Sequence, residues 1–432
     1  MEPIDQIAVV FFLWTSLLTA TYFVFSRYTR IGVVTLAWAG LLAYSIPALI
    51  GVSVSLPRPG MPAGMYPASL DAVTAVGLSL AGFGIMVLIA SVTFAKPKLR
   101  CRTEPLTRDD QGFVIAAIVV VVALYAFLSA LMGWSFFLDG RHKVEAEGGI
   151  ALIFWRWAVA FGLLASIRSK KIAPIAFFAL MLALVAVSGD RTVPVITAVA
   201  SLLLVLYDRR VLSVLLSPVP WVAIPALGAS IFLIKPLYIS IKNGQSFGSV
   251  WSSIKPSSIL FQWEAFVTHE LLERVLASGF RYSYETMLLL SGGQLLVVPS
   301  AFGLNSAQFN TEIQAQLFPD LTYGVAYSYL AQWVSMFHLP GAFVAGALFA
   351  AVIGLLHRWL TVASSRWFLL ALMLGSVTAI YAHRNSVENL LAVWRQAAIV
   401  FAIILIVQQG WKLLRWSLST PSRTPTTIEQ SV

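Results

Sequence analysis

The residues of this sequence that are best suited to chemistry are arginines at the ends of long apolar runs. An arginine near the middle of a bilayer costs about 2.5–3.5 kcal/mol on insertion scales, so each such position needs a physical reason. The planar guanidinium group bonds two oxygens at once and stays charged at every relevant pH, which suits diphosphate groups. The arginines concerned are Arg156, Arg191, Arg281, Arg384 and Arg395. Together they predict a cationic cavity that binds an anionic group.

The turn Ser188–Pro194 reads Ser-Gly-Asp-Arg-Thr-Val-Pro. Asp190 can cap the helix that follows, and proline is tolerated in a first helical turn. The free N–H groups of that helix start, beside Arg191, would form an anion site. The alternative is a tight turn in which Asp190 and Arg191 simply pair or reach the surface. Arg156 lies about 9 Å below the start of its own run, a depth that snorkelling to the surface explains only in part.

A second group of charges surrounds the start of the last apolar run. His383 and Arg384 are followed by Glu388 and Arg395. Offsets of four, seven and eleven residues bring Arg384, Glu388 and Arg395 onto one face of a helix, over roughly 16 Å of depth. The alternative is that Glu388 pairs with one arginine, which would still leave a net positive charge facing the interior. A mixed-charge loop, Asp139–Lys143, adds Arg141, for which a solvated surface is the alternative.

The elements that position these residues must be membrane helices. The chain has 432 residues, of which 59% are hydrophobic and 11% charged, and its mean hydropathy is +0.83. No soluble domain of this length has that composition. Basic loops on one side of a bilayer explain the net charge of +10, so no nucleic-acid partner is expected. The single Cys101 permits no intramolecular disulfide, and no Cys/His spacing predicts a metal site.

About eleven apolar runs approach the 20 or so residues that cross a bilayer. They are Ile7–Phe25, Ile31–Val52, Leu70–Ala95, Gly112–Gly133, Gly149–Ile167, Ile172–Ser188, Val193–Tyr207, Val211–Ile234, Tyr327–Leu356, Trp367–Ala382 and Leu390–Gln408. Within Tyr327–Leu356, the residues Leu339–Pro340–Gly341 predict a break between an interfacial helix and a true span.

The predicted fold class is an all-α polytopic membrane protein with one large, mainly helical periplasmic loop. The predicted organisation is an N-terminal bundle of about eight helices (1–234), a loop subdomain (235–322), about three C-terminal helices (323–410) and a tail (411–432).

Loop charges predict the orientation of the chain. One set of loops holds 17 basic residues against five acidic ones, whereas the interval 235–322 holds five against six. Cytoplasmic loops carry the Lys/Arg excess, so the interval is expected outside, which in a bacterium is the periplasm. The N-terminus is expected outside with its first span retained, because Glu2 and Asp5 stand where a signal peptide is basic. The C-terminus is then cytoplasmic.

Two helices are expected within the interval. Ile259–Leu276 has apolar residues at spacings of three and four, with Glu264, Glu273 and Arg274 on the opposite face. This pattern is typical of an amphipathic helix on the membrane surface or on the rim of the bundle. Arg281–Leu290 predicts a second, short helix that ends at Ser291–Gly293.

At four places the sequence resembles the bacterial oligosaccharide repeat-unit polymerases, the Wzy-type O-antigen and capsule polymerases. These are the turn Ser188–Arg191, the large loop late in the chain, the segment Gly324–Gln332 that leads through Pro340–Gly341 into a span, and Arg384–Ser386 before the last span. The resemblance covers residues 150–408 and rests on short, degenerate motifs. Many members carry a carboxylate where Gln332 aligns, so no role is carried over to that residue. The family is similar in fold to the O-antigen ligases, which places both among metal-independent glycosyltransferases of the GT-C type.

The resemblance implies transfer of a growing glycan from undecaprenyl diphosphate to the non-reducing-end hydroxyl of an incoming lipid-linked repeat unit. The reaction would take place at the periplasmic face of the bacterial inner membrane and would need no cofactor. The implied partners are the lipid-linked oligosaccharide, the bilayer, a chain-length regulator and a flippase.

The residues present agree with that chemistry. A sugar diphosphate is already a good leaving group, so charge stabilisation by Arg191 and Arg384 would supply much of the catalysis. Arg156, Arg281, Arg395 and Arg141 would bind the substrate. The base for the acceptor hydroxyl would be Glu285, His383 or Glu264. Glu285 is preferred because it lies four residues from Arg281, which would be one helical face.

Other functions compete with this one. A metal-dependent GT-C mannosyltransferase would usually carry acids in its first outer loop, and Val52–Ser69 has none. An O-antigen ligase differs mainly in its acceptor, and His338 or His383 could serve as its late-span histidine. A transporter or flippase of lipid-linked sugars would also use a cationic cavity, although transporters more often show repeated halves with broken helices. A purely structural scaffold explains neither the long loop nor the arginines.

Overall fold

The computed structural model describes residues 3–56, 64–93, 108–138, 141–218, 263–296, 299–304, 306–321 and 327–419, with a few single positions between 222 and 249. The described chain is mostly helical. Its helices are α1 (Pro3–Arg27), α2 (Val33–Leu49), α3 (Leu70–Thr93), α4 (Arg108–Met132), η1 (Phe136–Leu138), α5 (Arg141–Ser169), α6 (Ile172–Val187), α7 (Thr192–Leu206), α8 (Val211–Leu215), α12 (Glu264–Ser278), α13 (Tyr284–Gly293), η2 (Pro299–Phe302), α14 (Gln308–Leu317), α15 (Tyr329–Val362), α16 (Ser365–Tyr381), η3 (Ala382–Arg384) and α17 (Val387–Ser419). Two short strands, β1 (Val52–Ser55) and β2 (Gly64–Pro67), pair antiparallel.

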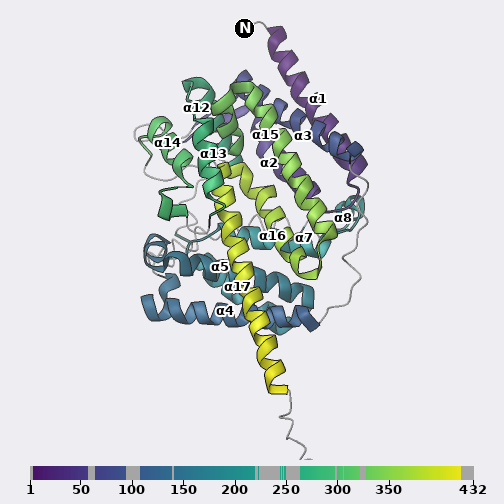
Figure 1. Cartoon of the computed structure of the whole chain (residues 1–432). Coiled ribbons are helices and arrows are strands. Elements are labelled where there is room, and N and C mark those ends of the chain that lie inside the picture. Colours follow the sequence, from purple (N-terminus) through teal and green to yellow (C-terminus); the bar gives the residue numbers. More distant parts are fainter. Residues whose placement is uncertain are drawn as a thin grey trace, which may run out of the picture.

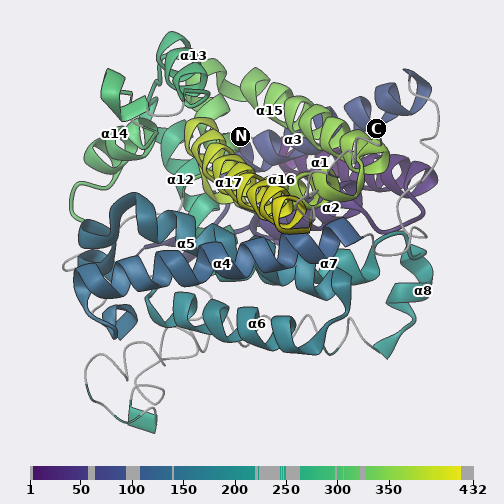
Figure 2. The ribbon, with the colours of Figure 1, turned by 60° about the horizontal axis from the view of Figure 1, so that its bottom comes forward.

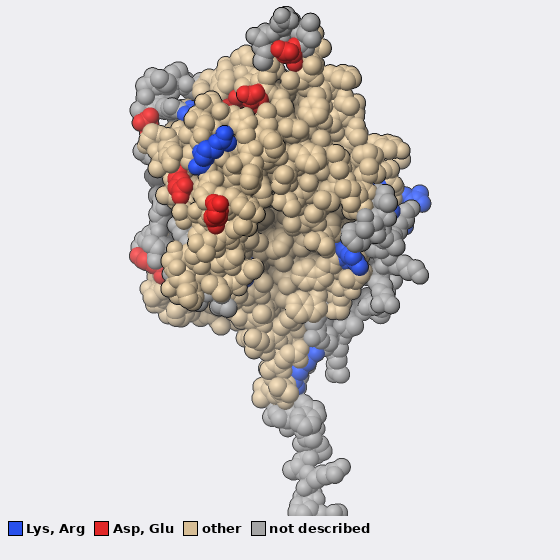
Figure 3. Space-filling view, turned by 45° about the horizontal axis from the view of Figure 1, so that its top comes forward, with Lys and Arg blue, Asp and Glu red and all other residues tan. Residues whose placement is uncertain are grey.

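Ten of the eleven predicted apolar runs coincide with helices of the described chain. Seven of the described helices are long and apolar enough to cross a membrane, namely α1, α3, α4, α5, α15, α16 and α17, while α2, α6 and α7 are apolar but shorter. The run Val211–Ile234 begins with α8 and then lies mostly outside the described residues. Figure 3 shows a face whose described surface is largely free of charged side chains. These features are those of a helical membrane protein, and the number of crossings stays a prediction.

The long helices form two groups that cross each other. Helix α3 packs between α1 and α15, and these three run side by side (Figure 1). Helices α4, α5 and α6 form a separate layer that lies across the direction of α17 (Figures 1 and 2). Helices α12, α13 and α14 lie toward the end of the molecule at which α1 begins, which we call the outer end. The C-terminal part of α17 leaves at the opposite end and continues as a helix past the predicted boundary at 410.

Loops that were predicted to share the cytoplasmic side do gather in the described chain, away from the outer end. Arg30 after α1 forms an ion pair with Asp208 after α7, with 2.8 Å between Nη1 and Oδ2. The Tyr28 ring contacts the ring of His357, near the end of α15, with 5.2 Å between centroids. This grouping is what the charge pattern requires, whichever side of the membrane it faces.

The first outer loop folds as a hairpin that rests on α12. The Leu56 N–H donates to Glu270 Oε2 at 2.6 Å, and the Ser69 N–H donates to Glu273 Oε1 at 2.7 Å. The Arg274 guanidinium holds the other oxygen of Glu270 at 2.6 Å. Glu270 and Glu273 are buried, at 1% and 7% exposure. The polar face of α12 is therefore covered in part by the hairpin, whose backbone N–H groups these carboxylates accept.

The second helix of the interval begins later than predicted. Ser283 caps α13 by accepting the Thr286 N–H at 3.1 Å, so Arg281 precedes the helix. The helix continues through Gly293, where an end at Ser291–Gly293 was expected. Helix α14 was not predicted at all. Its Phe309 is fully buried and packs against Tyr282, with 4.9 Å between ring centroids.

The predicted break in the long apolar run 327–356 is confirmed. Helix α15 is interrupted at His338, whose backbone has φ 57° and ψ −147°. This residue directly precedes Leu339–Pro340–Gly341, and proline cannot continue a helix without losing a hydrogen bond. The short part of α15 before the break carries Tyr329 and Gln332, and both belong to the site described below.

Close packing of α15 on α3 gives a first testable prediction. A Cβ atom at Gly346 would overlap the backbone of Ser79, so Gly346→Ala must push the two helices apart. We expect a loss of about 1–3 kcal/mol in stability, the usual cost of overpacking. The measurement is the thermal unfolding of the purified protein in detergent.

Gly354 provides the matched control, because it lies on the same helix and a Cβ there would meet no atom within 4 Å. Gly354→Ala should leave the melting temperature unchanged or raise it, since alanine is favoured over glycine in helices by about 1 kcal/mol. Equal melting temperatures for the two variants would contradict the packing of α3 on α15.

Candidate functional site

An ion pair between Arg384 and Glu264 lies at the centre of the candidate site. Arg384 Nη1 is 2.6 Å from Glu264 Oε1, and the Tyr44 hydroxyl donates to Glu264 Oε2 at 3.2 Å. The three side chains come from η3, the first turn of α12 and the outer part of α2. The Arg384 and Glu264 side chains are 33% and 38% exposed, so both can be reached by a ligand. Partly exposed ion pairs contribute little to stability, so a competing anion could replace Glu264 on Arg384.

A second arginine is paired more deeply. Arg156 Nε on α5 is 3.4 Å from Asp190 Oδ2, and both residues are buried. Asp190 Oδ1 also accepts the Thr192 N–H at 2.8 Å, although Arg191, and not Asp190 as predicted, is the N-cap residue of α7. Asp190 therefore pairs with Arg156, a partner that was not considered. The charges of Glu264 and, more weakly, Asp190 both act on Arg384.

His383 lies behind this pair in an aromatic box. Its ring stacks on Tyr44 with 5.0 Å between centroids and meets the edges of Phe349 and Tyr329 at 4.9 and 5.6 Å. The side chain is buried, with 3% of the residue exposed. In this arrangement the ring of His383 supports Tyr44. His338, the other histidine considered, is exposed at the break in α15.

The expected face of Arg384, Glu388 and Arg395 does not exist. Helix α17 begins at Val387, so Arg384 lies before it in η3. Glu388 is fully buried and accepts the Gln332 side-chain amide at 2.8 Å on both oxygens, and the Tyr282 hydroxyl at 3.1 Å. Neutral hydrogen-bond donors, and not the expected arginine, therefore contact the Glu388 carboxylate. Gln332 also accepts the Val387 N–H at 2.8 Å, which fastens α15 to the start of α17.

Arg395 lies further along α17 and belongs to another contact. Its guanidinium donates to the side-chain oxygen of Gln294, at the end of α13, at 2.8 Å. The side chain is partly exposed. Arg395 thus connects α17 to the segment that contains α12, α13 and α14, which we call the outer segment. It is not part of the Arg384–Glu264 pair.

The remaining predicted residues are exposed, or only their backbone position is described. Arg191 and Arg281 are exposed, and Arg141 is the first residue of α5, of which only the backbone position is described. Glu285 is exposed in the first turn of α13, where its own backbone N–H and the Ser283 hydroxyl bond its carboxylate and hold the pKa of Glu285 below its ordinary value. The reason for preferring Glu285 as the base is removed, because Arg281 is not on the same helix.

Two residues of the candidate site, Tyr44 and Glu264, were not predicted or not preferred from the sequence. Tyr44 was not considered, although it is a lone hydroxyl near the outer end of an apolar run. Glu264 was only one of three candidates for the base. Neither residue has a short motif around it, because their contact joins positions 220 residues apart. The packing of α12 on α2 brings them together.

In the described residues no group of three or more His, Cys, Asp or Glu side chains could hold a metal ion. Comparison with protein-family models, with curated proteins and with solved structures finds no match to this chain. The function therefore has to be argued from the residues and their geometry.

Proposed function

We propose that this protein is a bacterial inner-membrane glycosyltransferase that polymerises oligosaccharide repeat units carried on undecaprenyl diphosphate. The product would be an O-antigen, capsule or exopolysaccharide, made at the periplasmic face. The observation that carries the proposal is the half-buried Arg384–Glu264 pair at the outer end, with Asp190, the partner of Arg156, near enough to act on Arg384. A cation and a carboxylate in contact are the two groups that this transfer needs.

In the proposed mechanism the diphosphate of the donor replaces Glu264 on Arg384. The guanidinium can offer two N–H groups to phosphate oxygens, and its charge stabilises the leaving diphosphate. Glu264, released from its ion pair, accepts the proton of the acceptor hydroxyl. The acceptor oxygen then bonds to the anomeric carbon as the bond from that carbon to the phosphate oxygen breaks. Atoms and charge balance without a cofactor.

Tyr44 would hold the base in place during this exchange. Its hydroxyl donates to Glu264 Oε2, the oxygen that is not bonded to Arg384 Nη1. When the substrate takes Arg384, Tyr44 keeps the carboxylate at the site. The neighbouring Arg156–Asp190 pair places a second guanidinium deeper in the bundle, toward the lipid part of the substrate.

The wider setting of the proposal follows the charge pattern of the loops. The N-terminus and the interval 235–322 would lie in the periplasm and the C-terminus in the cytoplasm. The substrate partners would be the lipid-linked oligosaccharide and the bilayer. A flippase would supply the substrate, and a chain-length regulator would limit the product.

Glu264→Gln tests the assignment of the base. It keeps a side-chain oxygen for the Tyr44 hydroxyl but removes the group that accepts the proton. General base catalysis contributes about 10²–10⁴-fold, so long-chain glycan should disappear. Glycan length is measured in a deletion strain complemented by each variant, with the protein level in the membrane measured alongside.

Glu285→Gln is the matched control, because Glu285 is an exposed glutamate of the same outer segment that no described contact joins to Arg384. It should give wild-type glycan. Loss of polymer in Glu285→Gln together with normal polymer in Glu264→Gln would reverse the assignment.

An O-antigen ligase would use the same donor chemistry with a different acceptor. The two functions are separated by supplying purified protein with either a second lipid-linked repeat unit or a lipid A core acceptor. Transfer to the repeat unit is the result that the polymerase proposal requires. A lipid-linked sugar flippase would move labelled donor across proteoliposomes and transfer it to neither acceptor.

A further inference from the structure

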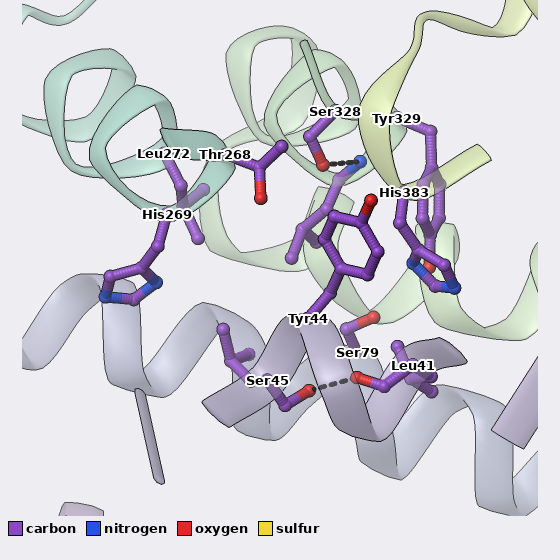
Figure 4. Close-up of a pocket in the computed structure, with 12 residues that line it drawn as sticks. Leu41, Tyr44, Ser45, Ser79, Thr268, His269, Leu272, Ser328, Tyr329 and His383 are labelled. Atoms are coloured by element: carbon purple, nitrogen blue, oxygen red, sulfur yellow. Dashed lines mark hydrogen bonds between the residues drawn. The ribbon is translucent and has the colours of Figure 1, made fainter. Parts of the chain in front are cut away.

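A small polar cavity lies behind the Arg384–Glu264 pair, between α2, α3, α12 and the start of α15 (Figure 4). It has a volume of about 30 Å³, and its polar lining includes Tyr44, Ser79, Thr268, Ser328, Tyr329 and His383. In Figure 4 the ring of His383 stands beside Tyr44 and Tyr329, with Ser79 on the helix below.

Some of the polar side chains around the cavity already have partners. The Thr268 hydroxyl donates to the Ala265 carbonyl at 3.1 Å, and the Ser328 hydroxyl accepts the Leu330 N–H at 3.2 Å. The Tyr44 hydroxyl donates to Glu264. These groups therefore need no further hydrogen-bond partner in the cavity.

Three other polar groups on the cavity wall do need a hydrogen-bond partner. Ser79 Oγ, Tyr329 Oη and His383 Nε2 are buried and make no hydrogen bond of good geometry among the described residues, although the Ser79 hydroxyl lies close enough to Tyr329 to act on it. The His383 ring also lies near the Ala379 carbonyl. A water molecule that donates to Nε2 requires the neutral ring with its proton on the other nitrogen. A fourth group, His269 Nε2, is 3.6 Å from Glu273 Oε1, and burial lowers the pKa of His269 to about 4, so it adds no charge near neutral pH.

Buried polar groups without partners are rare because each costs free energy, and ordered water is the usual solution. A water molecule needs about 10–15 Å³ of such space and two to four polar partners. The cavity meets both conditions. Apolar cavities stay dry, but this one has two hydroxyl groups and one imidazole acceptor on its walls.

We propose that this cavity is a binding site for an ordered water molecule. The water donates one hydrogen bond to His383 Nε2 and accepts from the hydroxyl groups of Ser79 and Tyr329. It thereby fixes the neutral tautomer of His383, whose ring backs Tyr44 and through it Glu264. The site is independent of the proposed function, because it concerns the resting protein and needs no substrate.

Ser79→Ala tests the site through stability. If water bridges the three groups, removing one partner weakens the bridge, and the melting temperature should fall by roughly 1–3 °C. If the cavity is dry, Ser79→Ala removes a buried hydroxyl that has no partner, and the melting temperature should stay equal or rise. The melting temperature of Tyr329→Phe should fall in the same way as that of Ser79→Ala.

Ser376 is the matched control, since its hydroxyl is also buried without a partner in the described chain but does not line the cavity. Ser376→Ala should therefore leave the melting temperature equal or higher. A high-resolution density map of the wild-type protein should show a solvent peak within hydrogen-bond distance of His383 Nε2. An empty cavity in that map, or Ser79→Ala behaving like Ser376→Ala, would overturn the proposal.

Discussion

Arg384→Ala is expected to abolish long-chain glycan while leaving the protein in the membrane at its normal level. In the proposed mechanism Arg384 exchanges Glu264 for the diphosphate of the donor. Loss of one charged hydrogen bond costs about 1.5–3 kcal/mol, or roughly ten- to a hundredfold in rate, and Arg384 can offer two. Polymer length depends on many successive transfers, so short chains should be all that remains. The measurement is glycan length in a complemented deletion strain.

Two further variants make this result specific. Arg384→Lys keeps the charge but not the planar fork, so it should also fail if the diphosphate is held through two oxygens. Arg30→Ala removes an arginine from a comparable ion pair, at 2.8 Å from Asp208, away from the outer end. It should give wild-type glycan. Normal glycan length in Arg384→Ala would count heavily against the assignment.

Gln332→Glu is expected to destabilise the protein strongly. Gln332 donates to both oxygens of Glu388, which is fully buried. A glutamate at this position would bring two carboxylates into contact in the interior, and one of them would have to take up a proton. Contacts between like charges cost several kcal/mol, so the melting temperature and the yield of folded protein should both fall.

The exchange of both side chains should rescue much of that loss. With Gln332→Glu and Glu388→Gln combined, the new glutamate can accept the Val387 N–H and the new amide, and the Tyr282 hydroxyl still finds an oxygen. Only one of the two bonds between the side chains is given up. If the double variant is no more stable than Gln332→Glu, the contact between α15 and α17 is not as described.

The contact between Gln332 and Glu388 could not be predicted from the sequence. The amide lies on α15 and the carboxylate on α17, 56 residues further along the chain. Nothing in the sequence around Gln332 or Glu388 indicates that this amide and this acid are in contact.

The helices themselves could largely be predicted from the sequence. Long apolar runs such as those that form α1, α3 and α17 have few other stable states in a membrane, because their backbone must be satisfied internally. The break at Pro340 was also predicted, since the missing N–H has a local effect. The hairpin and α14 were not predicted, because their burial depends on α12, far away in sequence.

The site was predicted only in part, for the same reason. Arg156 and Arg384 were identified because a charge in an apolar run is a strong signal. Their partners Asp190 and Glu264 could not be assigned, since an ion pair between two helices depends on how those helices pack. The prediction that Arg384, Glu388 and Arg395 share one helical face is wrong, because the chain turns at Asn385 before α17 begins.

Helix α12 is the element that joins the outer segment to the membrane helices. Its carboxylates hold the hairpin at Leu56 and Ser69, and its first residue, Glu264, holds Arg384. Displacement of α12 would therefore disturb both the hairpin and the Arg384–Glu264 pair.

In the proposed mechanism, Arg384 binds a lipid diphosphate in competition with Glu264. The most direct measurement is the affinity of purified protein in lipid nanodiscs for farnesyl diphosphate, a short prenyl diphosphate. We expect Arg384→Ala to weaken binding by roughly tenfold or more, and Glu264→Gln to bind as tightly as the wild type or more tightly, because the competing carboxylate is gone. Equal affinities in the wild type and Arg384→Ala, or weaker binding in Glu264→Gln, would contradict the account.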